Sequence, residues 1–242
     1  NRPTDEKYVD KFDGASWSST ADMITARFAH MTAGTQNDAL AANNTTAEEF
    51  NGSTWASAGA LNISRTYLSG VGSSTNAALA VGSAKQTEEY DGTVWTVRPD
   101  KNDTAYAAAG GGISTAAIWF GGVPTAPTGN CTEEWNGVNW TASTPLINHR
   151  GYHMGFGTQN AAVAAGGNPT AITCTEEWNG SSWTTSGAMI VNRYGGTCNI
   201  GNVSNGMVAG GYTTPSNAKV ACTELYHGGT FHATLSAWSS GN

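Results

Sequence analysis

Short apolar runs separated by small polar turns recur along the chain. Residues 152–167 (YHMGFGTQNAAVAAGG) contain two such runs around a polar turn at residues 157–160, and residues 28–42 (FAHMTAGTQNDALAA) repeat the design. Runs this short, bounded by glycine and polar residues, are typical of β-strands rather than of amphipathic helices. The pattern therefore predicts pairs of antiparallel strands spaced along the sequence.

A hexapeptide, aromatic-(Asp/Asn)-Gly-x-x-Trp, marks a second kind of hairpin. It occurs at residues 12–17, 50–55, 90–95, 135–140 and 178–183, with a degraded copy (YHGGTF) at 226–231. The string TEEWNG is repeated without change at 132–137 and 175–180. Asp-Gly or Asn-Gly between strand-like runs predicts a tight type I′ turn, in which both central residues have positive φ. Each hexapeptide is thus the expected tip of a hairpin.

Two further landmarks keep a nearly constant distance from these hexapeptides. An arginine lies ten residues after the preceding tryptophan in four units, at Arg27, Arg65, Arg150 and Arg193, and Ala105 takes that place once. Sixteen or seventeen residues later comes a pair of small residues, which is Asn43-Asn44, Gly82-Ser83, Gly121-Gly122, Gly166-Gly167 or Gly210-Gly211. This set of landmarks at nearly constant spacing recurs every 38 to 48 residues, which indicates a repeat architecture.

Each unit supplies four short antiparallel strands, and one such sheet does not bury both of its faces. Radial stacking of the sheets does, so we predict a single all-β domain over residues 1–242 with the fold of a β-propeller. Five blades are favoured, with the N-terminal hairpin at residues 5–19 completing the last blade and residues 222–242 forming a degraded hairpin or C-terminal edge. The reverse arrangement of the two ends stays open. A ring of six blades would need two more strands, supplied by a neighbouring chain.

The landmarks resemble those of the kelch family: an arginine before the first strand, Gly-Gly ending the second, glutamate and an aromatic-Asp pair in the third, and tryptophan in the fourth. The resemblance spans residues 5–231 and implies a propeller fold. Asn43-Asn44 and Ala105 depart from the pattern. The TEEWNG string is also similar to kelch-like repeats in virion and tail-fibre proteins of marine bacteriophages, which implies a virion component.

Composition narrows the classes of partner. Charged residues make up only 12% of the chain and the net charge is −7, which argues against nucleic acid as a partner. No apolar stretch approaches the roughly 20 residues that a membrane-spanning helix needs, so membrane insertion is not expected. The chain begins at Asn1 without an initiator methionine or a signal-like segment, and we expect a processed form or part of a longer polypeptide.

The repeated tryptophans and arginines allow a structural and a functional interpretation. Aromatic faces stack on sugars, and arginines near the axis could hold an anion. Identical placement in every unit favours packing between blades for the tryptophans and the tying of neighbouring loops for the arginines. We therefore assign the following residues to the structural repeat: Trp17, Trp55, Trp95, Trp140, Trp183, Arg27, Arg65, Arg150, Gly166, Gly167, Gly210 and Gly211.

Candidate chemistry is sparse. The doubled glutamates (48–49, 88–89, 133–134 and 176–177) look like paired catalytic acids, but neighbours on a strand point to opposite faces of the sheet. His149 and His153 have the spacing of a helical zinc pair, yet an extended segment would separate them by about 13 Å. We predict no enzyme, no catalytic residue, no metal site and no cofactor. The cysteines are either buried thiols or include a Cys174–Cys198 disulfide across two blades.

Nearly all length variation between units falls in residues 45–49, 84–89, 123–134, 168–177 and 212–225. In a propeller these loops share a face with the arginine-bearing loops, so ligand binding is expected there. The candidate ligand-binding residues are Tyr212, Asn168, Lys85, Pro124 and Arg193.

We expect a non-enzymatic adhesion or decoration protein of a virion or cell surface, outside the cell. Its expected partner is a glycan or protein receptor, with other virion or filament subunits and a homo-oligomer as further possibilities. A kelch scaffold that binds only proteins and a carbohydrate-active propeller enzyme are the alternatives.

Overall fold

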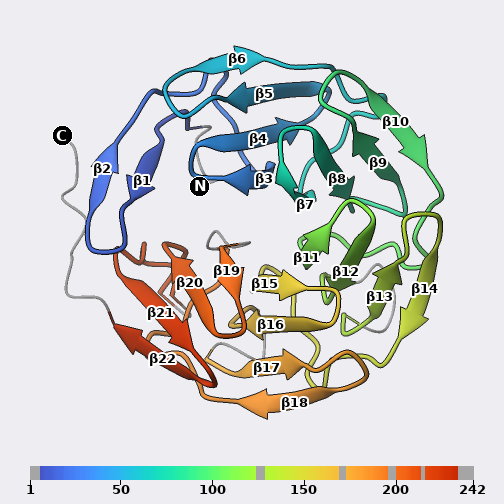
Figure 1. Ribbon diagram of the computed structural model, residues 1–242. Helices are drawn as coiled ribbons and strands as arrows, with labels where there is room; N and C mark the ends of the chain where they lie inside the picture. The colour runs from blue at the N-terminus through green and yellow to red at the C-terminus, as the bar shows by residue number, and fades with distance from the viewer. Residues whose placement is uncertain (1–5, 124–128, 169–172, 196–199, 214–215, 234–242) are drawn as a thin grey trace.

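The computed structural model describes residues 6–123, 129–168, 173–195, 200–213 and 216–233, and every regular element in these ranges is a β-strand. The strands form five four-stranded antiparallel sheets around a common centre, so the fold is a five-bladed β-propeller (Figure 1). This confirms the all-β propeller predicted from the repeat. No helix of the length and hydropathy needed to cross a membrane occurs in the ranges just given.

Within each blade the strands follow one another from the centre of the ring to its rim (Figure 1). The first blade contains β3 (Met31–Thr35), β4 (Asp38–Asn43), β5 (Thr46–Phe50) and β6 (Trp55–Ser57). The second contains β7 (Ser69–Ser74), β8 (Ala77–Val81), β9 (Thr87–Tyr90) and β10 (Trp95–Arg98). The third contains β11 (Ala109–Ile113), β12 (Ala116–Phe120), β13 (Thr132–Trp135) and β14 (Trp140–Ser143). The fourth contains β15 (Met154–Thr158), β16 (Ala161–Ala165), β17 (Thr175–Trp178) and β18 (Trp183–Ser186). The fifth contains β19 (Gly201–Asn202), β20 (Asn205–Ala209), β21 (Thr223–His227) and β22 (Thr230–Ala233).

The outer hairpins turn at the Asp-Gly and Asn-Gly pairs, but the expected type I′ turn is wrong. In the first blade Gly52 has a φ of 92°, whereas Asn51 is not among the residues with positive φ. The Asn51 Oδ1 instead accepts hydrogen bonds from the backbone N–H groups of Ser53 (3.0 Å) and Thr54 (2.9 Å). The same bonding recurs at Asp13, Asp91, Asn136 and Asn179. The side chain closes the turn, so a second residue with positive φ is not needed.

Glycine allows the innermost strands of neighbouring blades to approach closely. A Cβ atom at Gly70 in β7 would lie 2.2 Å from the carbonyl oxygen of Thr32 in β3. A Cβ atom at Gly111 in β11 would lie 2.8 Å from the carbonyl oxygen of Gly157 in β15. The glycine-rich inner strands are therefore a requirement of the narrow centre of the ring.

Four arginines each pair with a glutamate of their own blade in the buried interior. The pairs are Arg27–Glu48 (2.7 Å), Arg65–Glu88 (2.7 Å), Arg150–Glu176 (2.5 Å) and Arg193–Glu224 (2.5 Å). The glutamate also accepts backbone N–H groups of the loop before the blade, as Glu176 does from Ile147 (2.7 Å). Arg150 in addition donates to the carbonyl oxygen of Cys174 (2.9 Å). Each pair thus ties three segments of one blade together.

The third blade has Ala105 in place of the arginine, and Lys101 supplies a buried cation there. Its Nζ lies 3.9 Å from the centre of the Trp119 ring and donates to the carbonyl oxygens of Asp103 and Ala105. Burial lowers the pKa of Lys101 to about 8, although the nearby Asp103 and Glu133 carboxylates favour the charged form. The blade therefore replaces the lost arginine by a lysine from the preceding loop.

The tryptophans of the outer strands lie in the seams between blades. Trp140 Nε1 donates to Thr87 Oγ1 of the preceding blade (2.9 Å), and Trp183 Nε1 donates to Thr132 Oγ1 in the same way (2.9 Å). Trp95, Trp140 and Trp183 are buried. Their rings therefore fill the seams between neighbouring sheets.

The structure differs from the favoured expectation for the two ends of the chain. The strands β21 and β22 complete the fifth blade, and the N-terminal strands β1 (Asp10–Phe12) and β2 (Trp17–Ser19) form a separate two-stranded sheet. The degraded C-terminal hairpin holds the blade because Glu224 still pairs with Val208 of β20 and binds Arg193. The N-terminal hairpin lies between the fifth and first blades (Figure 1), where Trp17 Nε1 donates to Thr223 Oγ1 (3.1 Å).

Candidate functional site

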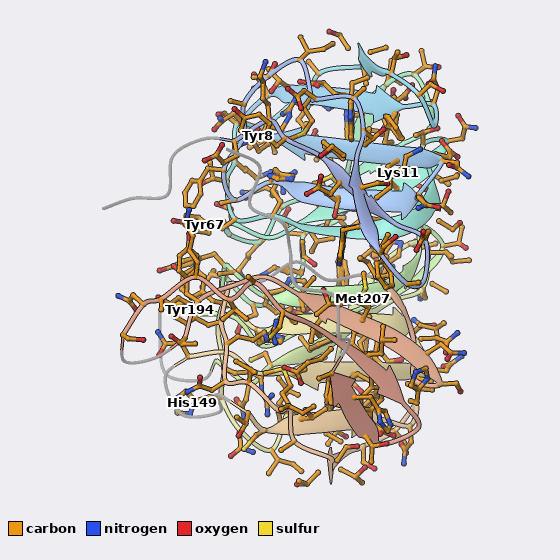
Figure 2. All side chains as sticks on the ribbon, turned by 90° about the vertical axis from the view of Figure 1, so that its left-hand side faces the viewer. Tyr8, Lys11, Tyr67, His149, Tyr194 and Met207 are labelled. Atoms are coloured by element: carbon orange, nitrogen blue, oxygen red, sulfur yellow. The ribbon has the colours of Figure 1, made fainter. Side chains whose placement is uncertain are left out.

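Six aromatic side chains gather on one face of the ring, where the loops that follow the arginines emerge. This set is named here the aromatic cluster, and it consists of Phe28, Tyr67, Tyr106, Tyr152, Tyr194 and Tyr212, all of them partly exposed. Successive ring centres in that order lie 5.4, 5.6, 6.3, 6.4 and 5.9 Å apart. Figure 2 shows Tyr67 and Tyr194 on the same side of the disc. The five blades thus contribute to one continuous aromatic surface.

The cluster lies over the axis of the ring. Tyr67 leads into the second blade and Tyr152 into the fourth, and these blades are not neighbours, yet their ring centres are 5.9 Å apart. Aromatic pairs at this separation and in an edge-on arrangement attract each other beyond the area they bury. The rings therefore meet at the centre instead of lining five separate sites.

A repeated backbone conformation presents these rings. The second residue after the arginine position has a positive φ in every blade: Ala29 (51°), Tyr67 (56°), Ala107 (51°), Tyr152 (52°) and Gly195 (67°). Its N–H group donates to the backbone carbonyl oxygen of the equivalent residue in the preceding blade. These bonds run from Tyr67 to Ala29 (2.8 Å), from Tyr152 to Ala107 (2.8 Å) and from Gly195 to Tyr152 (2.7 Å). Left-handed backbone at a residue with a side chain is uncommon and persists only where its surroundings hold it. The rings are therefore preorganised.

The cluster is uncharged. Burial raises the pKa of Tyr152 above its ordinary value, and the neighbouring Tyr106 and Tyr67 raise it further. The Tyr194 hydroxyl donates to Asn217 Oδ1 (2.9 Å). Ring faces and neutral hydroxyl groups are thus what this surface offers to a ligand.

The residues predicted to bind a ligand are dispersed. Tyr212 belongs to the cluster, and its backbone pairs with that of Tyr194. Asn168 is half-buried and pairs with Gly151 through its backbone, while Lys85 is exposed. Arg193 is fully buried and its guanidinium is committed to Glu224. Pro124 lies outside the described residues.

The other five members of the cluster were missed by the sequence reasoning. The signal was present, because an aromatic residue stands one or two positions after the arginine place in each of the five units: Phe28, Tyr67, Tyr106, Tyr152 and Tyr194. The alternation between the two positions hid the regularity. Only a fold that brings these loops to one axis makes the rings neighbours.

The doubled glutamates divide between the two faces of each sheet, as predicted. Glu48 binds Arg27 in the interior, whereas Glu49 accepts the hydroxyl of Tyr90 from the next blade (2.7 Å). In the third blade a hollow of about 450 Å³ includes Glu133, whose carboxylate already accepts three hydrogen bonds from Asn102 and Asp103 at 2.7 to 2.8 Å. These carboxylates are hydrogen-bonded parts of the scaffold.

Histidines and cysteines form no metal-binding group within the described residues. His153 is buried, and burial together with Arg150 lowers its pKa to about 3, while His149 is exposed on the surface (Figure 2). The expectation of buried thiols is wrong for the described cysteines, because Cys174 is exposed and Cys131 and Cys222 are partly exposed. Cys198, the possible disulfide partner of Cys174, lies outside the described residues.

Neither a protein-family model nor a curated protein matches this chain. The function must therefore be inferred from the fold and from the geometry of the aromatic cluster. A β-propeller that presents a preorganised surface suggests a binding or scaffold role.

Proposed function

We propose that this protein is a non-enzymatic binding module that recognises a glycan through the aromatic cluster. The observation that carries the proposal is the meeting of six partly exposed aromatic rings at the axis on the face of the length-variable loops. Pyranose rings place their C–H faces against aromatic rings, and tyrosine hydroxyls can donate to or accept from sugar hydroxyls.

The charge distribution supports a neutral sugar over an anionic one. The arginines beneath the cluster are buried, and their guanidinium groups bind glutamates. The side chains that form the cluster are phenyl and phenol groups. A sulfated or uronic-acid-rich polysaccharide would meet no exposed cation from the cluster itself.

The proposed setting is a virion or cell surface, where the protein would serve in adhesion or decoration. The similarity of TEEWNG to kelch-like repeats of bacteriophage virion and tail-fibre proteins supports this setting. So does the low content of charged residues, 12%, with many small polar side chains. The kelch-like identity of the repeat is part of the same proposal.

A panel of neutral and acidic oligosaccharides on an array tests the proposal, followed by calorimetry with the best ligand. Tyr194→Ala and Tyr106→Ala each remove one ring from the cluster and are expected to weaken binding about tenfold or more, which corresponds to about 1.4 kcal/mol. Tyr8→Ala is the matched control because Tyr8 is 75% exposed and lies outside the cluster. Its affinity should equal that of the unaltered protein.

Three outcomes would contradict the proposal. Absence of sugar binding, combined with a protein ligand whose affinity falls in the cluster variants, would favour a protein-binding kelch scaffold. Cleavage or oxidation of an oligosaccharide by the purified protein would favour an enzyme. Equal losses in Tyr8→Ala and Tyr194→Ala would place any sugar site outside the aromatic cluster.

A further inference from the structure

The N-terminal hairpin has the geometry of the outer half of a blade. Phe12 pairs with Trp17 as Tyr90 pairs with Trp95 in the second blade, and the two aromatic pairs have ring-centre distances of 5.1 and 4.9 Å. The bond from Trp17 to Thr223 repeats the bond from Trp183 to Thr132, which joins a blade to its predecessor. The hairpin therefore occupies a sixth blade position after the fifth blade.

The inner half of this position is empty of strands in the described part of the chain. In the complete blades the third strand pairs on both sides, as β9 pairs with β8 and β10, whereas β1 pairs with β2 alone. Thr20 N–H donates to the Val9 carbonyl across the hairpin, so by alternation the N–H and C=O groups of Asp10 point away from β2. Because β1 lies on the inner side of β2 (Figure 1), these groups are on the edge that faces the centre of the ring. An unpaired strand edge of this kind is a template for another strand.

The described residues have no inner hairpin left to fill the position. All five inner hairpins, β3–β4, β7–β8, β11–β12, β15–β16 and β19–β20, belong to complete blades. The connection from one blade to the next uses at least ten residues, such as 99–108 and 144–153. The nine residues 234–242 after Ala233 are fewer than that connection alone. A second copy of residues 1–242 is limited in the same way.

We propose that the inner edge of β1 at Asp10 accepts a β-hairpin from a polypeptide segment other than residues 1–242, which completes a sixth blade. The ladder hydrogen bonds supply the attraction and the flanking blades select the side chains, as in other cases of strand addition. The inner hairpins of this chain set the size of the donor, two strands of about five residues joined by a tight turn.

Two features define the chemistry of the donor. Thr32 stands in β3 where the second, third and fourth blades have Gly70, Gly110 and Gly155, so the residue facing it must be small. Asp10 holds the place of Glu88, the carboxylate that binds Arg65. The donor is therefore expected to carry an arginine four residues before its first strand, as Arg65 precedes Ser69.

A synthetic peptide with the sequence of residues 65–81 (RTYLSGVGSSTNAALAV) meets these requirements and is the probe. At a concentration 100 times its Kd, bound peptide should raise the Tm of the protein by about 5 °C. The control peptide carries proline at the position of Ala80, which pairs with Glu88 in the native blade and would pair with Asp10 here. Proline removes the N–H group needed for the ladder, so this peptide should not bind.

Variants of the hairpin locate the binding edge. Asp10→Pro removes the N–H that points to the centre and should abolish peptide binding. Ser19→Pro is the matched control, because Ser19 lies opposite Asp10 and its N–H points to the rim. It should bind the peptide as the unaltered protein does. Circular dichroism and the Tm measured without peptide test whether both variants fold.

A fusion of the peptide to the protein tests the proposal even if the free peptide binds weakly. Residues 65–81 joined to residue 242 by a Gly/Ser linker raise the local peptide concentration. The proposal is overturned if neither form raises the Tm above its proline control, or if Asp10→Pro binds as well as Ser19→Pro. It is also overturned if the protein forms dimers that Asp10→Pro disrupts, since a second copy would then cover the edge. Each result is independent of sugar binding at the aromatic cluster.

Discussion

The seam between the third and fourth blades and the seam between the first and second follow one plan but differ in their polar partners. In the third–fourth seam, Trp183 donates to Thr132. In the first–second seam the equivalent Trp95 is 5% exposed, and its Nε1 has no hydrogen-bond partner. The cause is Ala47, which stands three residues before Phe50 where the third blade has Thr132 three residues before Trp135.

The fourth–fifth seam shows the mirror image of that defect. Phe231 replaces the tryptophan, and Thr175 Oγ1 is buried without a partner. The hydroxyl and the indole thus form one unit divided between two blades, and loss of either member leaves the other unsatisfied. An unsatisfied buried polar group costs about 1–3 kcal/mol. The repeated bond between tryptophan and threonine is thus a property of residue pairs that lie in different repeats.

The largest expected effect concerns the buried Arg–Glu pairs of the second and fourth blades, each of which borders one of the two compared seams. Arg65→Ala and Arg150→Ala should each lower the free energy of unfolding by about 3–5 kcal/mol, because a buried glutamate would lose its cation. Urea denaturation measures both. Arg98→Ala is the control, since the Arg98–Glu89 pair is 42% exposed at the arginine and should contribute less than about 1 kcal/mol. Similar losses in all three variants would contradict the structural role of burial.

The two seams also differ in a titratable residue. His153 follows Arg150 by three residues where Leu68 follows Arg65, and burial and Arg150 lower the pKa of His153 to about 3. Below about pH 6.5 the unfolded chain binds a proton at this histidine and the folded chain does not. The contribution of His153 to the free energy of unfolding is therefore lost below that pH, by about 1.4 kcal/mol per pH unit toward pH 3.

The variant His153→Leu should therefore flatten the pH dependence of unfolding between about pH 6.5 and 4, measured by urea melts at several pH values. The control is His149→Leu, which makes the same replacement at an exposed histidine. An unchanged slope in His153→Leu would contradict a buried neutral imidazole.

Thr132→Val removes the hydrogen bond of the third–fourth seam and makes it resemble the first–second seam, where the tryptophan has no partner. It keeps the shape of the side chain but removes the acceptor of Trp183, at an expected cost of about 1–3 kcal/mol. Thr132→Ser retains a hydroxyl and should lose less. Equal losses in the two variants would show that packing, not the hydrogen bond, sets the difference between the seams.

The smallest expected effect is a gain. Ala47→Thr offers an acceptor to Trp95 and should raise the free energy of unfolding by about 1 kcal/mol, seen as a higher urea midpoint. Ala47→Val has the same size without the hydroxyl and serves as the control. A gain in the valine variant alone would indicate a packing defect at this seam.

The sequence predicts the blades well because each landmark has a local cause. Gly70 is needed where a neighbouring carbonyl lies close, and Arg65 stands at a fixed distance from Glu88 because both belong to one blade. The turn type was missed, since Asn51 can close a turn either by its backbone or by its side chain. The pair Asn51-Gly52 is compatible with both turns, so the sequence does not distinguish them.

The candidate site was harder to predict because its contacts cross the ring. Tyr67 and Tyr152 meet although they belong to blades that are not neighbours, and no spacing along the chain encodes that distance. The two terminal hairpins posed a related problem. Both carry the same hexapeptide pattern, so the repeat alone did not decide which of them completes the fifth blade.

The bond between Trp17 and Thr223 also bears on the order in which the molecule folds. It joins positions 206 residues apart, whereas the equivalent bond from Trp183 to Thr132 spans 51. Contacts between distant positions form late, because the entropy of closing the loop must be lost first. During synthesis the N-terminal hairpin emerges first and has no neighbour on its fifth-blade side until the last strands are made. Ring closure is therefore the final step of folding and the first contact to open, which hydrogen exchange at β1 and β2 would record.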